Sequence, residues 1–349
     1  MRRRDTRIAR MCTAAIVAAF GLQPAMAEVL AQTPSFKASV DVVSVTAVVR
    51  DSRGRPVRNL GREDFQVYER GKLRQIVQFK SSDQGPISLA VLFDVSGSMR
   101  GTQQMEAGQR AVEHILSWVN PSQDEVGLFS FDAELRKEVD FTTDLAKVKT
   151  AVNSLTAVGQ TSLYDAIAST AKMVADASSS GAAALPQRSA VVVITDGVDT
   201  GSKMSPSEVS VIASGIDVPV YIFAVVASVD DPRETEDQRS AARASNLQEL
   251  ARNTGGELLI SSTPAQASIA ARQIISELRH QYVLAFEASA RAGWRPLQVR
   301  TRKDDHVVRA RSGYHGATPS SGLEHGAAGA ADSGPATVRI VPDVLRRRP

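Results

Sequence analysis

Residues 87–99 read ISLAVLFDVSGSM, an apolar run that stops at an aspartate and two serines. An uninterrupted apolar run of this length is typical of a strand buried on both faces. Similar runs predict strands at residues 125–131, 189–195 and 218–226, with a weaker one at 256–261. Segments with helical periodicity separate them, at residues 103–119, 145–155, 162–177, 205–215, 246–254 and 264–278. This alternation predicts an α/β fold, a doubly wound and mostly parallel sheet with helices on both faces.

The segments on either side of this region have a β pattern. Strands are predicted at residues 39–51, 64–70 and 72–79 before it, and at 282–289, 297–302 and 306–312 after it. Neither flank has enough strands to bury two faces alone, and an isolated hairpin is marginal in water. We therefore predict that both flanks pair into one small β-sandwich-like module, with the α/β domain inserted between them.

The predicted organisation has five parts. They are a signal peptide (1–27), an N-terminal β segment (28–86), the α/β domain (87–280), a C-terminal β segment (281–316) and a disordered tail (317–349). The tail is predicted from its low-complexity composition, ATPSSGLEHGAAGAADSGPA from residue 317.

The N-terminus explains the net charge of +3. Its first 27 residues carry five arginines and one acid, and without them 36 basic and 37 acidic residues remain. The basic stretch, a short apolar run and the sequence AMA predict an export signal that is cleaved between Ala27 and Glu28. We expect a periplasmic or extracellular protein with no stable membrane span. Without the signal peptide the chain has no excess of basic residues, so its charge gives no indication of nucleic-acid binding.

Oxygen-bearing side chains follow the predicted strands at the points where loops of an open α/β sheet meet a ligand. The candidate set is Asp94, Ser96, Ser98, Thr161 and Asp196. In the turn after residue 93, alternate side chains can point to one side while Gly97 lets the backbone fold tightly. A serine-rich helix cap is the alternative for the first three residues alone. Thr161 before a helix and Asp196 at a strand end favour one shared site.

Two carboxylates and three hydroxyls offer only oxygen. Zinc and copper prefer nitrogen or sulfur ligands, whereas Mg²⁺ and Mn²⁺ accept oxygen and keep positions for water or an outside ligand. The sequence therefore predicts a Mg²⁺ or Mn²⁺ site with an open coordination position.

These motifs resemble the von Willebrand factor A domain family, whose signature is D-x-S-x-S followed by a later Thr and a later Asp. The resemblance covers residues 87–279 and includes all five positions. It implies that the serines and threonine bind metal directly, that the aspartates bind directly or through water, and that a partner's carboxylate completes the coordination. The flanks, including RARSGYHG from residue 309, further resemble bacterial secreted von Willebrand A-related proteins of no known activity.

Other sites find less support in the sequence. There is no G-x-S-x-G nucleophile motif, no G-x-x-x-x-G-K-[ST] phosphate loop, and none of the five histidines pairs with a nucleophile motif. Residues 229–240, VDDPRETEDQRS, offer carboxylates for a second cation, but the interleaved Arg233 and Arg239 favour a solvated loop. Met99 and Tyr164 fit either a contact rim or core packing.

Two classes of function remain. The favoured one is an exported, metal-dependent adhesion module, not an enzyme, that captures a carboxylate-bearing protein with loops at residues 99–103, 158–164 and 197–203. The alternative is a Mg²⁺-dependent enzyme of the cell envelope or its accessory subunit. The motifs provide no obvious general base, which favours binding. A scaffold with vestigial metal binding is weakened by the complete ligand set.

Overall fold

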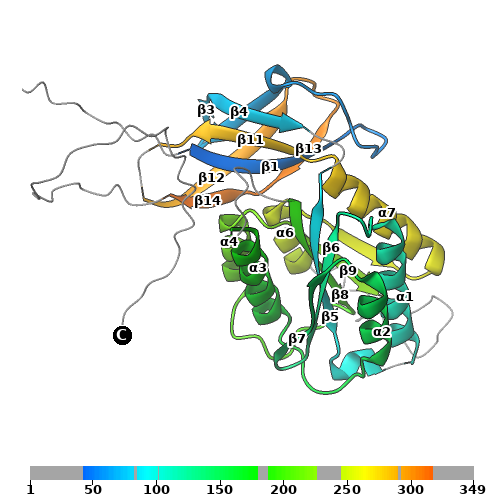
Figure 1. Ribbon diagram of the computed structural model, residues 1–349. Helices are drawn as coiled ribbons and strands as arrows, with labels where there is room; N and C mark the ends of the chain where they lie inside the picture. Colours follow the sequence, from blue (N-terminus) through cyan, green and yellow to red (C-terminus); the bar gives the residue numbers. More distant parts are fainter. Residues whose placement is uncertain are drawn as a thin grey trace, which may run out of the picture. The chain divides into compact units, whose positions relative to one another are not determined.

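The structure, a computed structural model, describes residues 42–81, 85–100, 102–179, 188–225, 245–289 and 292–316. The predicted signal peptide, the acidic segment 229–240 and the tail 317–349 lie outside these ranges. Among the helices within them, none is long and apolar enough to cross a membrane. Figure 1 shows the chain with the element labels used below.

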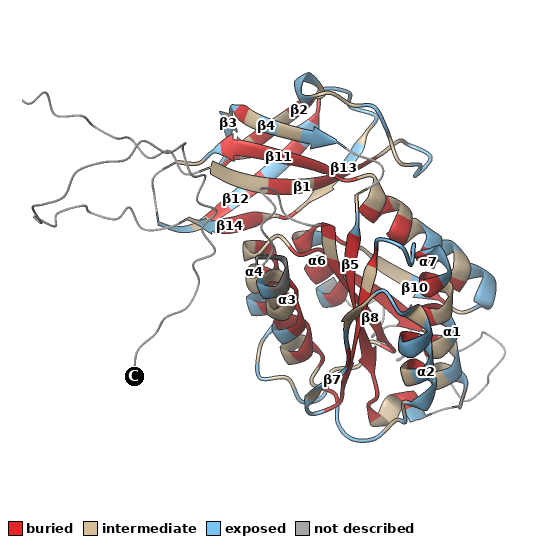
Figure 2. Cartoon of the chain, viewed as in Figure 1, coloured by how far each residue is buried: buried red, intermediate tan, exposed pale blue. Residues whose placement is uncertain are grey.

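A six-stranded sheet in the order β10-β9-β8-β5-β6-β7 forms the centre of the α/β domain (Figure 1). Its parallel strands are β5 (Ile87–Asp94), β6 (Glu125–Phe131), β8 (Arg188–Thr195), β9 (Val220–Val225) and β10 (Leu258–Ser261). Every residue of β5 is buried, as Figure 2 shows for the middle of the sheet. The predicted α/β fold class is therefore confirmed.

Helices cover both faces of this sheet. On one face lie α1 (Thr102–Trp118), α2 (Leu145–Ser154) and α7 (Pro264–Arg279), and on the other α3 (Leu163–Ser179), α4 (Pro206–Gly215) and α6 (Ser245–Thr254). Each face has its own hydrophobic core, because successive side chains of the strands point to opposite sides. Leu89 and Val91 pack on the first face, and Ala90 and Leu92 on the second.

The edge strand β7 (Leu135–Thr142) was not predicted from the sequence and pairs antiparallel with β6. Half of its side chains are charged and exposed, so it lacks the apolar run that marks the buried strands. Charged residues are a common feature of edge strands, where they discourage pairing with another chain.

The flanking segments form two four-stranded sheets, in the orders β13-β1-β11-β4 and β14-β12-β2-β3. From the N-terminal side come β1 (Val42–Arg50), β2 (Phe65–Glu69), β3 (Lys72–Arg74) and β4 (Ile76–Ser81), with a short 3-10 helix at Arg62–Asp64. The C-terminal side supplies β11 (Tyr282–Glu287), β12 (Gly293–Thr301), β13 (Val307–Ala310) and β14 (Gly313–Gly316).

Both sheets combine strands from the two flanks, so the predicted pairing is confirmed. β11 lies between β1 and β4, and β12 pairs with β2. The shared core contains Phe65 and Val67 from one side and Tyr282 and Phe286 from the other. Neither flank could bury these side chains without the other, which is the physical reason for the arrangement.

One predicted strand was wrong in extent. Residues 72–79 were predicted as one strand, but the chain leaves β3 after Arg74 and begins β4 at Ile76. β3 pairs with β2, whereas β4 pairs with β11 in the other sheet. The short β14 was also missed because GYHG has no apolar alternation. The exact domain boundaries stay predictions.

A buried charge cluster holds one of these two sheets together. Glu69 on β2 is 1% exposed and accepts hydrogen bonds from Arg295 (Nη1–Oε1 2.7 Å) and Tyr314 (OH–Oε1 2.6 Å). Arg74 pairs with its other oxygen. Burial alone would raise the pKa of Glu69, but the hydrogen bonds from Tyr314, Arg295 and Arg74 outweigh burial and lower the pKa to about 2.

Glu69 is therefore expected to contribute stability that depends on pH. Its pKa of about 2 in the folded chain lies below the ordinary value of 4.5. The unfolded chain thus binds more protons in this window, and about 3 kcal/mol of stability present above pH 4.5 is lost as the pH falls toward 2. Denaturant unfolding at pH 7 and pH 3 measures the larger part of this loss. Glu69→Gln should be less stable at pH 7 and should lose less on acidification. An equal loss in both proteins would contradict this role.

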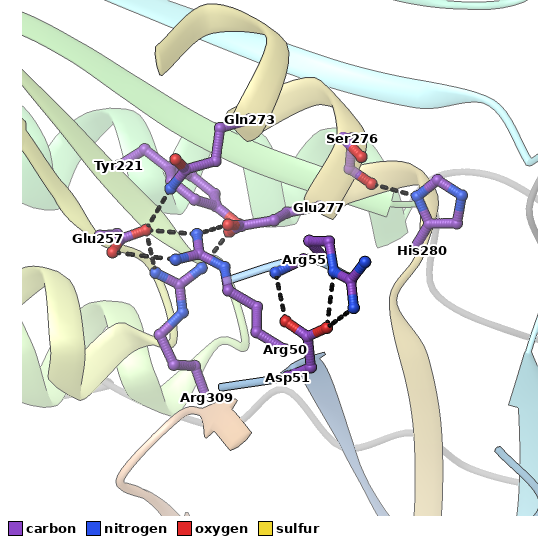
Figure 3. A network of polar contacts seen from close by, with 10 residues as sticks. All are labelled: Arg50, Asp51, Arg55, Tyr221, Glu257, Gln273, Ser276, Glu277, His280 and Arg309. Carbon is purple, nitrogen blue, oxygen red and sulfur yellow. Dashed lines mark hydrogen bonds and ion pairs between the residues drawn. The ribbon is translucent and has the colours of Figure 1, made fainter. Parts of the chain in front are cut away.

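A second charge cluster links the β strands to the α/β domain (Figure 3). Arg50 on β1 and Arg309 on β13 both bind Glu257 (Nη2–Oε2 2.6 Å and Nη1–Oε2 2.5 Å). Both arginines also pair with Glu277 on α7, which is 1% exposed. Burial alone would raise the pKa of Glu257, but Arg309 and Arg50 outweigh burial and lower it. Two positive and two negative side chains thus meet across the junction.

Candidate metal centre

The candidate residues gather at one edge of the central sheet because β5 and β8 are parallel neighbours. Phe93 pairs with Ile194, so the two strands end side by side. Asp94 is the last residue of β5, and Asp196 follows the last residue of β8. The carboxyl ends of parallel strands are the usual place for a ligand in such sheets.

Asp94 is fully buried, and both of its carboxylate oxygens are oriented by neighbours. Oδ1 accepts a hydrogen bond from the Ser96 backbone N–H (2.9 Å). Oδ2 accepts one from the Thr195 hydroxyl (2.6 Å), which in turn accepts from the Gly197 N–H (3.0 Å). Gly197 has a φ of 90°, a conformation that glycine adopts without strain. The turn after β8 thereby helps to hold the carboxylate at the end of β5.

The two serines of the motif connect this carboxylate to the second one. The Ser96 and Ser98 hydroxyl oxygens are 3.0 Å apart, and the Ser98 side chain is hydrogen-bonded to Asp196. The residue between the two serines is Gly97. A Cβ at this position would lie 3.0 Å from the Gly159 carbonyl oxygen, which is closer than ordinary contact distance. A larger residue would push apart two of the loops that carry the site.

Thr161 lies two residues before α3 and is 3% exposed. Its segment is bound to the loop after β5, since the Gly97 N–H donates to the Gly159 oxygen (2.9 Å) and the Val158 N–H to the Val95 oxygen (2.6 Å). Direct side-chain contacts or charge interactions thus join the other four candidates, and backbone hydrogen bonds bring the Thr161 loop to them. The role of all five residues as metal ligands stays a prediction.

The pKa values of the two aspartates are raised, so a positive charge beside them would stabilise their charged forms. Burial raises the pKa of Asp94 to about 7 despite hydrogen bonds from Ser96 and Thr195, and the charge of Asp196 adds to the rise. Burial also raises the pKa of Asp196, against hydrogen bonds from Ser98 and the Val198 N–H. Within the described ranges, no ion pair with a basic side chain reaches either carboxylate, and Asp196 Oδ2 is buried without a hydrogen-bond partner. A divalent cation would supply that partner and that charge.

The described part of the chain contains no group of three or more His, Cys, Asp or Glu side chains arranged to hold a metal. The candidate set has only two carboxylates, so hydroxyl oxygens must complete it. Such a set suits a hard cation that keeps water ligands.

Sequence reasoning missed two polar residues beside the site. Thr195 holds Asp94, and its only sequence signal is its position directly before Asp196. Asp132 follows β6, and the Ser162 N–H donates to its backbone oxygen (2.8 Å). The carboxylate of Asp132 accepts two hydrogen bonds from Arg136 (3.0 and 2.9 Å), so it already has a positive partner.

Some side chains around the site pack in a hydrophobic core, and others lie at the surface. Met99 is fully buried in the core, so its rim role in the sequence analysis is not supported. Tyr164 is half-buried and packs against the second core. Val158 is 54% exposed on the loop that leads to Thr161. An apolar contact point therefore lies on a loop of the site.

Comparison with known proteins agrees with the sequence motifs. Residues 89–198 match the family model of the von Willebrand factor type A domain, so the chain contains such a domain. No curated protein sequence matches the chain.

Three solved structures illustrate the similarity. A von Willebrand factor type A protein from Catenulispora acidiphila is 10% identical, with 82% of this chain and 76% of that chain covered and a TM-score of 0.45. The conserved hypothetical protein BatB from Bacteroides thetaiotaomicron is 17% identical (54% and 97% covered, TM-score 0.42). Proximal thread matrix protein 1 from the mussel byssus, with a zinc-occupied MIDAS motif, is 15% identical (60% and 49% covered, TM-score 0.42).

Proposed function

We propose that this von Willebrand factor type A domain holds a divalent cation and uses it to capture a carboxylate of a protein partner. The observation that carries the proposal is the pair of buried aspartates, Asp94 and Asp196, without a basic partner in the described ranges and with one orphaned carboxylate oxygen. Burying two like charges is costly unless a cation neutralises them.

The cation would be held by Asp94, Ser96, Ser98, Thr161 and Asp196, and we propose Mg²⁺ or Mn²⁺. Both ions prefer oxygen ligands and readily keep a coordination position for an outside group. When bound, the ion would supply an electrophilic position for one further oxygen ligand. The two aspartates would neutralise the ion, and the Ser96 and Thr195 hydrogen bonds would hold the Asp94 carboxylate in position for it.

The outside ligand that we propose for this position is a carboxylate of the partner. With at most two carboxylates on the ion, the open coordination position would stay electrophilic enough to take the oxygen of a partner's Asp or Glu. Charge-assisted contacts of this kind, desolvated at the centre of an interface, are where binding energy concentrates. The exposed Val158 offers an apolar contact on a neighbouring loop of the same domain. We also propose that the protein is exported, from the signal-like residues 1–27.

Binding fits the surroundings of the site better than turnover. A general base must be within reach of the substrate and free to take a proton. Asp132, the additional carboxylate found beside the site, is engaged by Arg136, which together with the Glu134 N–H lowers its pKa against the effect of burial. A Mg²⁺-dependent envelope enzyme or accessory subunit remains the second candidate, and turnover by the purified protein would favour it.

Partner capture is expected to depend on the metal. Immobilised protein should retain a partner from cell-envelope extract in Mg²⁺, lose it in EDTA, and regain it when Mg²⁺ or Mn²⁺ is added back. A polyglutamate peptide should compete, because it offers carboxylates to the same position. Ser98→Ala removes a candidate ligand and should abolish capture.

Ser154→Ala is the matched control, since its exposed hydroxyl donates only to the Ala151 carbonyl at the end of α2. Both variants should keep the circular dichroism spectrum of the wild type. Capture that survives EDTA, or that Ser98→Ala leaves unchanged, would show that the metal site is not the binding site.

A further inference from the structure

The segment that begins α3 is bound closely to the loop that follows Asp196. Backbone and side-chain hydrogen bonds connect residues 161–165 with residues 199–204, and we refer to this arrangement as the clasp. The Thr161 N–H donates to the Thr200 hydroxyl (3.1 Å). The Thr161 carbonyl accepts from the Thr200 and Gly201 N–H groups (3.0 and 2.8 Å). One proposed metal ligand, Thr161, is itself part of the clasp.

Asp199 forms one half of the clasp. Its Oδ1 accepts from the Leu163 N–H (2.9 Å) and from the Ser202 hydroxyl (2.6 Å). The Ser202 hydroxyl oxygen accepts from the Tyr164 N–H (2.9 Å). A helix is usually capped by the residue just before it. Here the first N–H groups of α3 are bound by a loop that lies 36 positions further along the chain.

Asp165 forms the reciprocal half. It lies in the first turn of α3 and accepts from the Lys203 N–H (Oδ2, 3.0 Å) and from the Met204 N–H (Oδ1, 2.9 Å). The Asp165 carboxylate therefore binds two backbone N–H groups of the other segment, and the Asp199 carboxylate binds one. Crossed contacts of this kind hold the two segments as one unit, because neither can shift without breaking hydrogen bonds at both ends.

The clasp contains one proposed ligand of the metal and begins shortly after the other in the sequence. Thr161 is two residues before Leu163, and Asp196 is three residues before Asp199. We propose that Asp199 and Asp165 are positioning residues that fix the spacing between Thr161 and Asp196, and thereby set the affinity of the site for its cation. The inference rests on the proposed function and extends it to residues that are not themselves metal ligands. Residues that orient metal ligands are worth about 10- to 100-fold in metal affinity.

Calorimetric titration of the purified full chain with Mn²⁺ and with Mg²⁺ tests the proposal. Asp199→Ala removes the acceptor and should weaken binding by about 10- to 100-fold. Asp199→Asn should bind nearly as the wild type, because one amide oxygen can still accept both hydrogen bonds. Asp165→Asn should be intermediate, since an amide replaces only one of the two acceptor oxygens.

Asp144→Ala is the matched control. Asp144 caps α2 by accepting from the Lys147 N–H (3.2 Å), so its loss weakens a helix end that is not part of the clasp. This variant should unfold at a lower temperature and bind the metal as the wild type does. Hydrogen exchange at the Thr161 and Thr200 amides of the metal-free protein should speed up in Asp199→Ala and not in Asp144→Ala.

The outcomes separate the two proposals. Wild-type protein that binds neither Mn²⁺ nor Mg²⁺ would overturn the proposed function and this inference together. Wild-type binding that Asp199→Ala leaves unchanged would overturn the inference alone and leave Asp199 a residue of folding stability. If Asp199→Asn binds as weakly as Asp199→Ala, the negative charge and not the clasp sets the affinity, and the inference is again wrong.

Discussion

Replacing Asp94 with alanine is expected to abolish cation binding while the domain stays folded. Both carboxylate oxygens of Asp94 are held in place, one by the Ser96 N–H and the other by the Thr195 hydroxyl. Its loss removes a proposed ligand and one of the two negative charges. Loss of a residue that only orients metal ligands weakens metal binding by up to about 100-fold. The loss of Asp94 should weaken Mg²⁺ binding by more than that.

Thermal unfolding with and without Mg²⁺ gives a second measurement of the same effect. A ligand that binds only the folded chain stabilises it, by about 2.7 kcal/mol when its concentration is 100 times the Kd. The wild type should show this rise in unfolding temperature, and Asp94→Ala should show none.

Asp94→Asn distinguishes loss of the ligand from damage to the fold. It keeps the volume of the side chain and removes a charge that burial penalises, as the raised pKa of about 7 indicates. The amide keeps one of the two acceptor oxygens, and removal of the buried charge should offset the loss of the other, so without metal this variant should stay folded at pH 8. A Mg²⁺-dependent rise in the unfolding temperature of Asp94→Ala would contradict the assignment of Asp94 to the site.

The sequence was sufficient to predict the edge of the sheet at which the candidate residues gather. Asp94 and Asp196 each follow an apolar run, and adjacent parallel strands necessarily end at the same edge. The groups that orient these residues were not predictable. Thr195 and Asp94 are 101 positions apart, and no local pattern distinguishes a threonine that holds a carboxylate from one that only ends a strand.

The flanking strands were predictable for a related reason. Each flank is too small to bury its own apolar residues. Pairing between the flanks buries the apolar residues of both, and it was therefore predictable. The division of residues 72–79 between two sheets was not predictable, because it depends on which partner each half meets. β3 and β4 are separated by Gln75 alone, and nothing in the local sequence requires a break there.

Long-range charge pairs also escape sequence reasoning. Arg50 and Glu257 are 207 positions apart, and each resembles an ordinary surface residue in its local sequence. Only the fold brings them together with Glu277 and Arg309 (Figure 3). These ion pairs can be identified only when the positions of β1 and β13 relative to Glu257 and Glu277 are known.

Replacing Glu277 with alanine is expected to cause a large loss of stability. Glu277 is 1% exposed, pairs with Arg50 and Arg309, and accepts a hydrogen bond from the Tyr221 hydroxyl (3.1 Å). Its removal leaves two arginine side chains, 15% and 13% exposed, to share Glu257. Breaking a buried ion pair by removing one partner costs about 3–5 kcal/mol, and denaturant unfolding at pH 7 measures that loss.

The comparison with Glu106→Ala shows whether burial is the cause. Glu106 pairs with Arg110 on the exposed surface of α1 (3.3 Å), and such pairs contribute only about 0–1 kcal/mol.

The same unfolding data test whether Glu277 couples the two parts of the chain, because a weakened junction should split one transition into two. Arg309→Ala and the double variant complete a mutant cycle, in which contacting charges should show a coupling of about 0.5–3 kcal/mol. If Glu277→Ala is within about 1 kcal/mol of the wild type, as expected for an exposed pair, the cluster does not hold the junction.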